Sequence, residues 1–135
     1  MARRGSSIGF MGRFGRSGDL RQLDGALRTL DLHPALVPEG VKLTIANLLK
    51  DHFDADEPPA HAYAPAAALV AYCALGPEAF AAANGADPAI AVERRIEAAI
   101  AAGAGHDADL VLLCLHAGLI QPAVVARFDL SVEEG

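Results

Sequence analysis

The chain has 135 residues, a formal net charge of −6, and 53% hydrophobic but only 5% aromatic residues. This length indicates one domain that buries enough surface to fold without disulfides or a structural metal. Two cysteines are too few for a disulfide framework, and no apolar run free of proline and histidine is long enough for a membrane span or a secretory signal. We expect a cytoplasmic protein, and the abundant Ala, Gly, Arg and Asp favour a bacterial source. The Arg- and Ser-rich start also suits an organelle transit peptide.

Charge is divided unevenly along the chain. Residues 1–30 carry a net charge of +4, and residues 31–135 carry −10. The start is rich in Gly, Arg and Ser, with glycine at every third position from 9 to 18, too few repeats for a collagen helix. We expect residues 1–17 to form a flexible arm, residues 18–130 a single helical domain, and residues 131–135 a frayed acidic tail.

The helical domain opens with leucines three to four residues apart, which predicts one apolar helix face. These leucines are Leu20, Leu23, Leu27 and Leu30. Asp19, with Gln22 three residues later, resembles a capping box at the start of this helix. Pro38 opens the next helix, with Lys42 and Lys50 away from its apolar side. That side carries Val41, Ile45, Leu48, Leu49 and His52.

Proline or aspartate marks the start of each later helix. The predicted helices cover residues 66–75, 77–83, 88–102, 108–117 and 122–128. Their starts are marked by Pro65, Pro77, Asp87 with Pro88, Asp107 and Pro122. The helix after Pro88 turns Val92, Ile96, Ala99 and Ile100 inward and leaves Glu93, Arg94, Arg95 and Glu97 mostly outward.

Residues 110–115, LVLLCL, are apolar on every side, which predicts the central buried helix. A β-strand is the competing interpretation, but the cap at Asp107 and the stop at Gly118 favour a helix. Cys73 and Cys114 sit in apolar runs and are expected to be buried free thiols. The predicted fold class is all-α, a compact bundle-like array of six or seven short helices.

The segment HFDADEPPAH contains the candidate metal ligands His52, Asp54, Asp56 and His61. Carboxylates and imidazoles together suit a divalent transition metal. The segment is bounded by proline and has no ligand pair at i, i+4 on a helix, so a solvated acidic loop is the favoured alternative. A similar group, His106, Asp107 and Asp109, is explained by a helix cap. A metal-dependent enzyme is the third-ranked function.

The candidate nucleophiles are poorly placed for catalysis. The four serines, Ser6, Ser7, Ser17 and Ser131, lie outside the helical domain, whereas a catalytic triad needs a rigidly held nucleophile beside its base. Cys114 and His116 are two residues apart and point away from each other on a helix. We expect no catalytic residue and no cofactor.

Residues 117–124, AGLIQPAV, resemble the turn and early recognition helix of bacterial helix-turn-helix regulators, with Cys114 at the small-residue position four before the glycine. The resemblance implies DNA binding around Gly118. It covers about twenty residues, and the residues after the turn are Ala and Val, with Arg127 as the one charge. A recognition helix usually carries polar side chains toward the bases, so a buried helix pair joined by a glycine turn is the favoured alternative.

The arm carries Arg3, Arg4, Arg13 and Arg16, interleaved with Phe10 and Phe14. Such a segment can grip a phosphate backbone and stack on bases, dock on an acidic protein surface including that of a neighbouring copy, or act as a solubilising tail. By elimination, the first-ranked function is a non-enzymatic protein-interaction or regulatory module with a protein partner. A nucleic-acid-binding protein is the alternative. A homo-oligomer stays open, and no membrane association is expected.

Overall fold

The structure, a computed structural model, describes residues 18–130 and contains no strand in that range. The predicted arm at 1–17 and tail at 131–135 lie outside the described residues. The all-α prediction is confirmed. The helices are α2 (Gly18–Thr29), α3 (Glu39–Phe53), α4 (Tyr63–Leu75), α5 (Pro77–Asn84), α6 (Ala86–Ala102), α7 (His106–His116) and α8 (Pro122–Phe128), with 3-10 turns η1 (Pro34–Leu36) and η2 (Ala60–Ala62).

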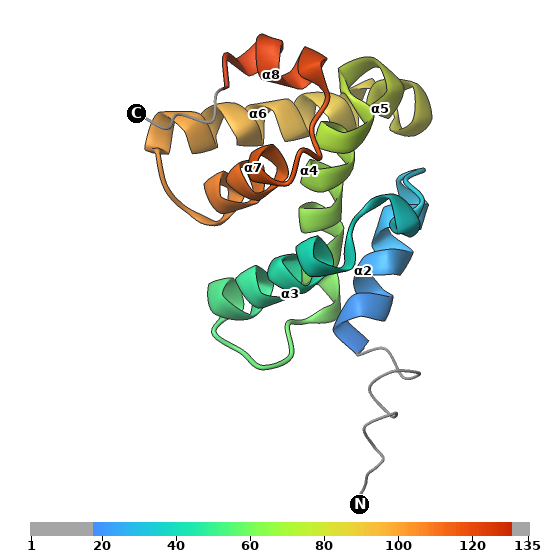
Figure 1. Cartoon of the computed structure of the whole chain (residues 1–135), viewed down its shortest axis with the longest axis vertical. Helices are drawn as coiled ribbons and strands as arrows, with labels where there is room; N and C mark the ends of the chain where they lie inside the picture. Colours follow the sequence, from blue (N-terminus) through green and yellow to red (C-terminus); the bar gives the residue numbers. More distant parts are fainter. Residues whose placement is uncertain (1–17, 131–135) are drawn as a thin grey trace, which may run out of the picture.

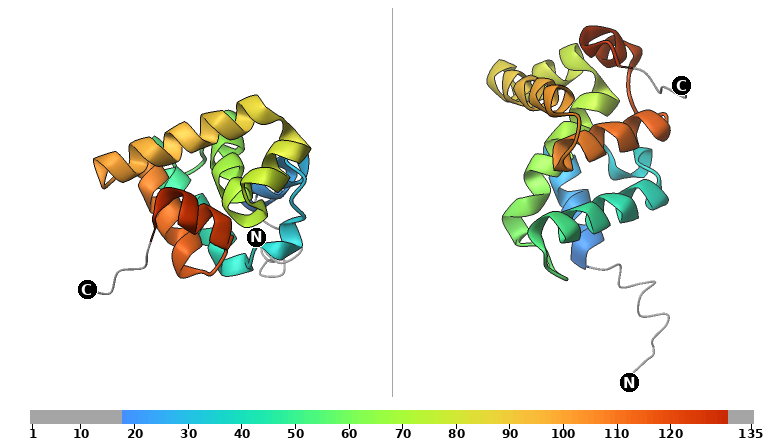
Figure 2. Two further views of the ribbon diagram at one scale, coloured as in Figure 1. Left: turned by 90° about the horizontal axis from the view of Figure 1, so that it is seen from above. Right: turned by 90° about the vertical axis from the view of Figure 1, so that its left-hand side faces the viewer.

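Helix α4 runs through the middle of the fold (Figure 1) and contacts α2, α5, α6 and α7. The views in Figure 2 show α2 and α3 gathered at one end of α4, and α5, α6 and α8 at the other. Ala66, Ala67 and Ala71 are fully or almost fully buried, and their small side chains let neighbouring helices approach closely. The large buried side chains of α4, Leu69 and Tyr72, fill the space between those neighbours.

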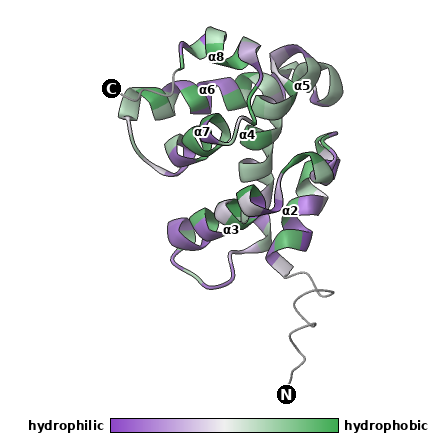
Figure 3. Ribbon diagram, in the orientation of Figure 1, coloured by the Kyte–Doolittle hydropathy of each residue, from purple (hydrophilic) through white to green (hydrophobic). Residues whose placement is uncertain are grey.

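The prediction that residues 110–115 form the central buried helix is wrong. These residues are helical, as expected, but they belong to α7, in which the side chain of Leu112 is 49% exposed. An apolar stretch shows only that a helix can be buried on all sides. It does not show how many neighbours that helix meets, and α4 meets more of them than α7. Hydropathy coloured on the ribbon shows apolar residues on several helices, not on one alone (Figure 3).

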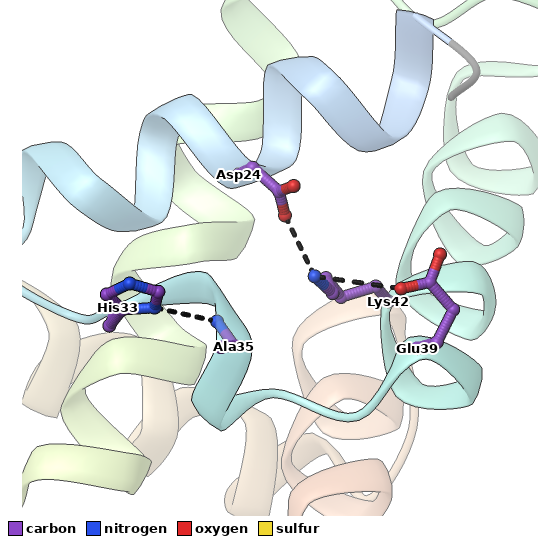
Figure 4. A network of polar contacts seen from close by, with 5 residues as sticks. All are labelled: Asp24, His33, Ala35, Glu39 and Lys42. Atoms are coloured by element: carbon purple, nitrogen blue, oxygen red, sulfur yellow. Dashed lines mark hydrogen bonds and ion pairs between the residues drawn. The ribbon is translucent and has the colours of Figure 1, made fainter. Parts of the chain in front are cut away.

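The position of Lys42 is a second point at which the prediction is wrong. The sequence pattern placed this side chain away from the apolar side of its helix. Its exposed fraction is only 4%, and its Nζ lies 3.1 Å from Asp24 Oδ1 on α2 and 3.9 Å from Glu39 Oε1 (Figure 4). A buried ammonium is tolerated when a carboxylate is within hydrogen-bonding distance. The pair therefore ties α3 to α2. Lys50, by contrast, is partly exposed and pairs with Asp19 at 3.2 Å.

Helix starts follow proline as predicted at Pro77 and Pro122, which are the first residues of α5 and α8. Three other helices, α4, α6 and α7, begin earlier than the sequence predicted. Residues Ala86 and His106 begin α6 and α7, so Asp87 and Asp107 lie in the first turn instead of capping it. Acidic side chains are favourable there because they face the positive end of the helix dipole. Pro65 is likewise the third residue of α4, a position that needs no N–H donor.

Both thiols behave as predicted: Cys73 on α4 and Cys114 on α7 are fully buried and unpaired by a disulfide. A hydrogen bond with Cys114, together with burial, raises the pKa of Cys73. In the segment between α7 and α8, the Leu119 N–H donates to the Cys114 carbonyl and the Gln121 N–H donates to the Cys73 carbonyl. This segment is therefore fixed against the middle of the fold.

Among residues 18–130, no helix taken singly is long and apolar enough to cross a membrane. Helices α6 and α7 meet those criteria of length and composition only when taken as a pair, and the pair is bent by 97°.

Candidate functional site

The candidate site is built around two stacked histidines. His52 lies in the last turn of α3 and His106 is the first residue of α7. Their rings are nearly parallel, with centroids 4.3 Å apart and an interplanar angle of 13°. The stack forms where α3 and α7 pack together, so two residues distant in sequence share one position in the fold.

Two clefts include this stack in their lining, and both are also lined by Arg95 and Asp107. The first, which we call the histidine cleft, has a volume of about 300 Å³. It adds the rings of Phe53 and His61 and an apolar floor made by Leu49, Ala62, Pro65 and Ala66. The second has a volume of about 370 Å³ and follows the alanines at the end of α6. The two stacked rings thus belong to the lining of both clefts.

Arg95 and Asp107 brace the site from the α6 side. Arg95 donates from Nε to Asp107 Oδ2 at 3.1 Å and from Nη2 to Asp107 Oδ1 at 2.9 Å, a two-point contact. Its Nη1 also donates to the carbonyl of Pro65 at 2.9 Å, which links α6, α7 and α4. The hydrogen bonds from Arg95 hold the pKa of Asp107 below its usual value, against the opposing effect of burial. The two charges therefore compensate each other inside the site.

The pKa of His106 is lowered. Burial is the main cause, followed by the electrostatic effect of His52 across the stack, whereas Asp107 acts in the opposite direction. The ordinary histidine pKa of about 6.5 is already below neutral pH. His106 is therefore a neutral imidazole at pH 7, and it becomes charged only under more acidic conditions.

The structure brings two of the four candidate metal ligands together. His52 and His61 both line the histidine cleft, with the ring of Phe53 edge-on to each at centroid distances of 4.9 and 6.2 Å. Asp54 and Asp56 do not line either cleft, and Asp54 ends α3 in a left-handed conformation. Within residues 18–130, no group of three or more His, Cys, Asp or Glu side chains is placed to hold a metal ion.

Sequence reasoning missed Arg95, which it placed on an outward face, and assigned His106 to a helix cap. Neither residue carries a local signal, because the stack depends on α3 meeting α7. The described residues that line the two clefts include no Ser, Thr, Cys or Lys. The site therefore offers imidazoles, aromatic faces, apolar carbon and one arginine–aspartate ion pair.

The helix-turn-helix resemblance falls on α7, the turn at Gly118 and α8. Gly118 has a φ of 71°, which fits the predicted turn. Arg127, the one charged side chain of α8, lies 3.5 Å from Glu93 on α6, and the side chain of Gln121 donates to the Ala74 carbonyl. These polar groups contact the body of the protein. The other DNA-contact candidates, Arg3, Arg4, Arg13 and Arg16, lie outside the described residues.

A second surface feature is an apolar groove of about 170 Å³ between α6 and α7. It is lined by Ile100 and Leu112, which are 45% and 49% exposed, and by Val111, Leu115 and Leu130. The sequence predicted Ile100 to point inward, and the structure corrects this. Ile100 lies near the end of α6, where the helix extends past the contacts that bury Ile96.

Comparison of the chain with protein-family models, curated proteins and solved structures gave no match.

Proposed function

We propose that this chain is a non-enzymatic protein-interaction module whose docking surface is the groove between α6 and α7. The observation that carries the proposal is the pair of half-exposed side chains, Ile100 and Leu112, on one apolar depression. Large aliphatic side chains left in water at a groove usually mark a place where another molecule binds. A groove between two helices suits the apolar face of a partner helix.

Charge defines the partner further. Glu97 and Asp109 are exposed and lie one helical turn before Ile100 and Leu112, so both apolar side chains have a carboxylate beside them. Residues 18–130 carry a net charge of −8. Complementary charge steers association and excludes partners of like charge. The partner we propose is therefore an amphipathic helix with an apolar face and basic flanks.

The test uses two synthetic amphipathic helices of about five turns, with the same leucine face and with either Lys or Glu on the polar face. Binding to the full-length protein is measured by fluorescence anisotropy. We expect the Lys peptide to bind and the Glu peptide not to bind. Ile100→Ser or Leu112→Ser should weaken binding about tenfold, which corresponds to about 1.4 kcal/mol.

The chain supplies a matched control in Ile90, which is also on α6 and is 44% exposed, but does not line the groove. Ile90→Ser should leave the affinity unchanged. An equal loss of affinity with Ile90→Ser would show that the peptide binds apolar surface in general. Equal binding of the Glu peptide, or no binding of the Lys peptide, would also contradict the proposal.

A further inference from the structure

We propose that the basic N-terminal segment, residues 1–17, docks in cis on the histidine cleft and on the acidic loop beside it. The occupant is this chain's own segment, and the site is distinct from the α6–α7 groove. Four observations carry the proposal: where the segment joins the fold, the charge it meets there, the lining of the cleft, and the composition and length of the segment.

The point at which the segment joins the fold is fixed by α2. Gly18 is the first residue of this helix. The next residue, Asp19, accepts a hydrogen bond from the Tyr63 hydroxyl at 2.7 Å and pairs with Lys50 at 3.2 Å. Lys50 is in the last turn of α3 and Tyr63 is the first residue of α4. The start of α2 therefore lies at the corner where α3 ends and α4 begins.

That corner is acidic. The turn that follows α3 and the last turns of α3 itself carry Asp51, Asp54, Asp56 and Glu57, all exposed. Within residues 18–130, none of these four carboxylates has an ion-pair partner. The hydropathy colouring shows this loop as a hydrophilic part of the surface (Figure 3). Four like charges close together favour the approach of a cationic segment.

The histidine cleft adjoins both ends of this loop. Phe53 lies just before the loop and His61 just after it, and both residues line the cleft. The side chain of Phe53 is 37% exposed. Aromatic rings on an apolar floor favour a further aromatic side chain, in offset or edge-on packing. The cleft thus suits phenylalanine, and the loop beside it suits arginine.

The segment has both residue types in the required order. Arg13 and Arg16 are the two arginines nearest to Gly18 in the sequence, and Phe10 and Phe14 alternate with them. Residues 1–17 contain no Asp or Glu. Extended chain spans at most about 3.5 Å per residue. Phe14 can therefore reach about 14 Å from Gly18, and Phe10 can reach about 28 Å. Gly18 is next to Asp19, which pairs with Lys50. Phe53 lies three residues after Lys50, only about 4.5 Å farther along the axis of α3. A tethered segment also has a high effective concentration at its site.

The experiment compares full-length proteins by ¹H–¹⁵N correlation spectroscopy. The test variants are Phe10→Ser with Phe14→Ser, and Arg13→Gln with Arg16→Gln. The matched control is Arg3→Gln with Arg4→Gln, which removes the same charge farther from Gly18. We expect both test variants to shift the backbone amides of Phe53, His61 and Ala62, and the control to leave them within a small fraction of that shift. Sedimentation analysis should give the mass of one chain.

Three results would overturn the proposal. The first is that the amides around the histidine cleft do not change in either test variant. The second is that the Arg3 and Arg4 control shifts them as much as the Arg13 and Arg16 variant, which would indicate a diffuse charge effect. The third is that the shifts depend on protein concentration and accompany a doubling of mass, which would place the segment on a second copy. None of the substitutions changes a residue of the core within residues 18–130.

Discussion

Acidification should destabilise this protein through the stacked histidines, and His106→Phe should remove most of that effect. In the folded protein the pKa of His106 lies below its ordinary value, so the unfolded chain takes up a proton at a higher pH than the folded chain does. Stability is therefore complete above about pH 6.5 and is lost progressively as the pH falls below that value. The charges that face His106 are His52 on α3, Arg95 on α6, and Asp107 and Asp109 on its own helix.

The magnitude follows from the stack. Two unit charges separated by the centroid distance of 4.3 Å repel by about 1 kcal/mol in water and about 4 kcal/mol at an effective dielectric constant of about 20. His52 is exposed, so solvent screens the pair and the lower end applies. We expect protonation of His106 in the folded protein to cost about 1 kcal/mol. His106→Phe keeps a flat ring against His52 but cannot become charged.

The assay is urea unfolding of the full-length protein at about pH 7.5 and about pH 5.5, on either side of the ordinary histidine pKa. The wild type should lose about 1 kcal/mol more than His106→Phe between these two values, because one group with an ordinary pKa of about 6.5 can account for at most about 1.4 kcal/mol over this pH interval. His116→Phe is the control, because His116 is exposed at the other end of α7. It should behave as the wild type does. If His106→Phe loses as much stability on acidification as the wild type, the assignment of the pH effect to His106 is refuted.

Three further predictions concern the core and the arm. Lys42→Met should destabilise the protein by about 2–3 kcal/mol because it removes the buried ammonium that donates to Asp24 and joins α3 to α2. Lys50→Met, at the partly exposed pair, should cost less than about 1 kcal/mol, and urea unfolding at neutral pH measures both variants. Leu69→Ala on the central helix α4 should lower the free energy of unfolding by about 2–5 kcal/mol, whereas Leu112→Ala on α7 should lower it by less than about 1 kcal/mol. A larger loss for Leu112→Ala than for Leu69→Ala would show that α7, not α4, is the central helix. A labelled random-sequence DNA duplex should show no arm-dependent anisotropy change at about 200 mM salt, because residues 18–130 carry a net charge of −8. Binding that requires residues 1–17 and weakens between about 50 and 200 mM salt would instead favour the nucleic-acid alternative.

The candidate site was only partly predictable. His52 and His61 were predicted as site residues because they lie near several carboxylates in one short segment of the sequence. The carboxylates proved not to line the cleft, and the second half of the site comes from α6 and α7. Residues 52 and 106 become neighbours only through the packing of α3 on α7, and a single sequence carries no signal for that pairing.

Local rules succeeded where neighbours in sequence decide the outcome. The leucine spacing from Leu20 predicted a helix because a helix face repeats every three to four residues, and Leu20, Leu23 and Leu27 are indeed its buried side. Pro77 and Pro122 marked helix starts because a first turn needs no N–H donor. These rules failed by one or two residues at Asp87 and Asp107, since an acidic side chain is favourable both as a cap and within the first turn.

The sequence by itself determined that this protein is helical, where its helices lie, and that Cys73 and Cys114 are buried thiols, because periodicity, proline and apolar runs act within a turn or two of the chain. Only the tertiary structure decided that α4 is the central helix, that Asp24 pairs with the buried ammonium of Lys42, and that His52 stacks on His106. Burial and charge pairing depend on which helices meet. That choice is made by side chains far apart in sequence, and each of them is compatible with more than one partner.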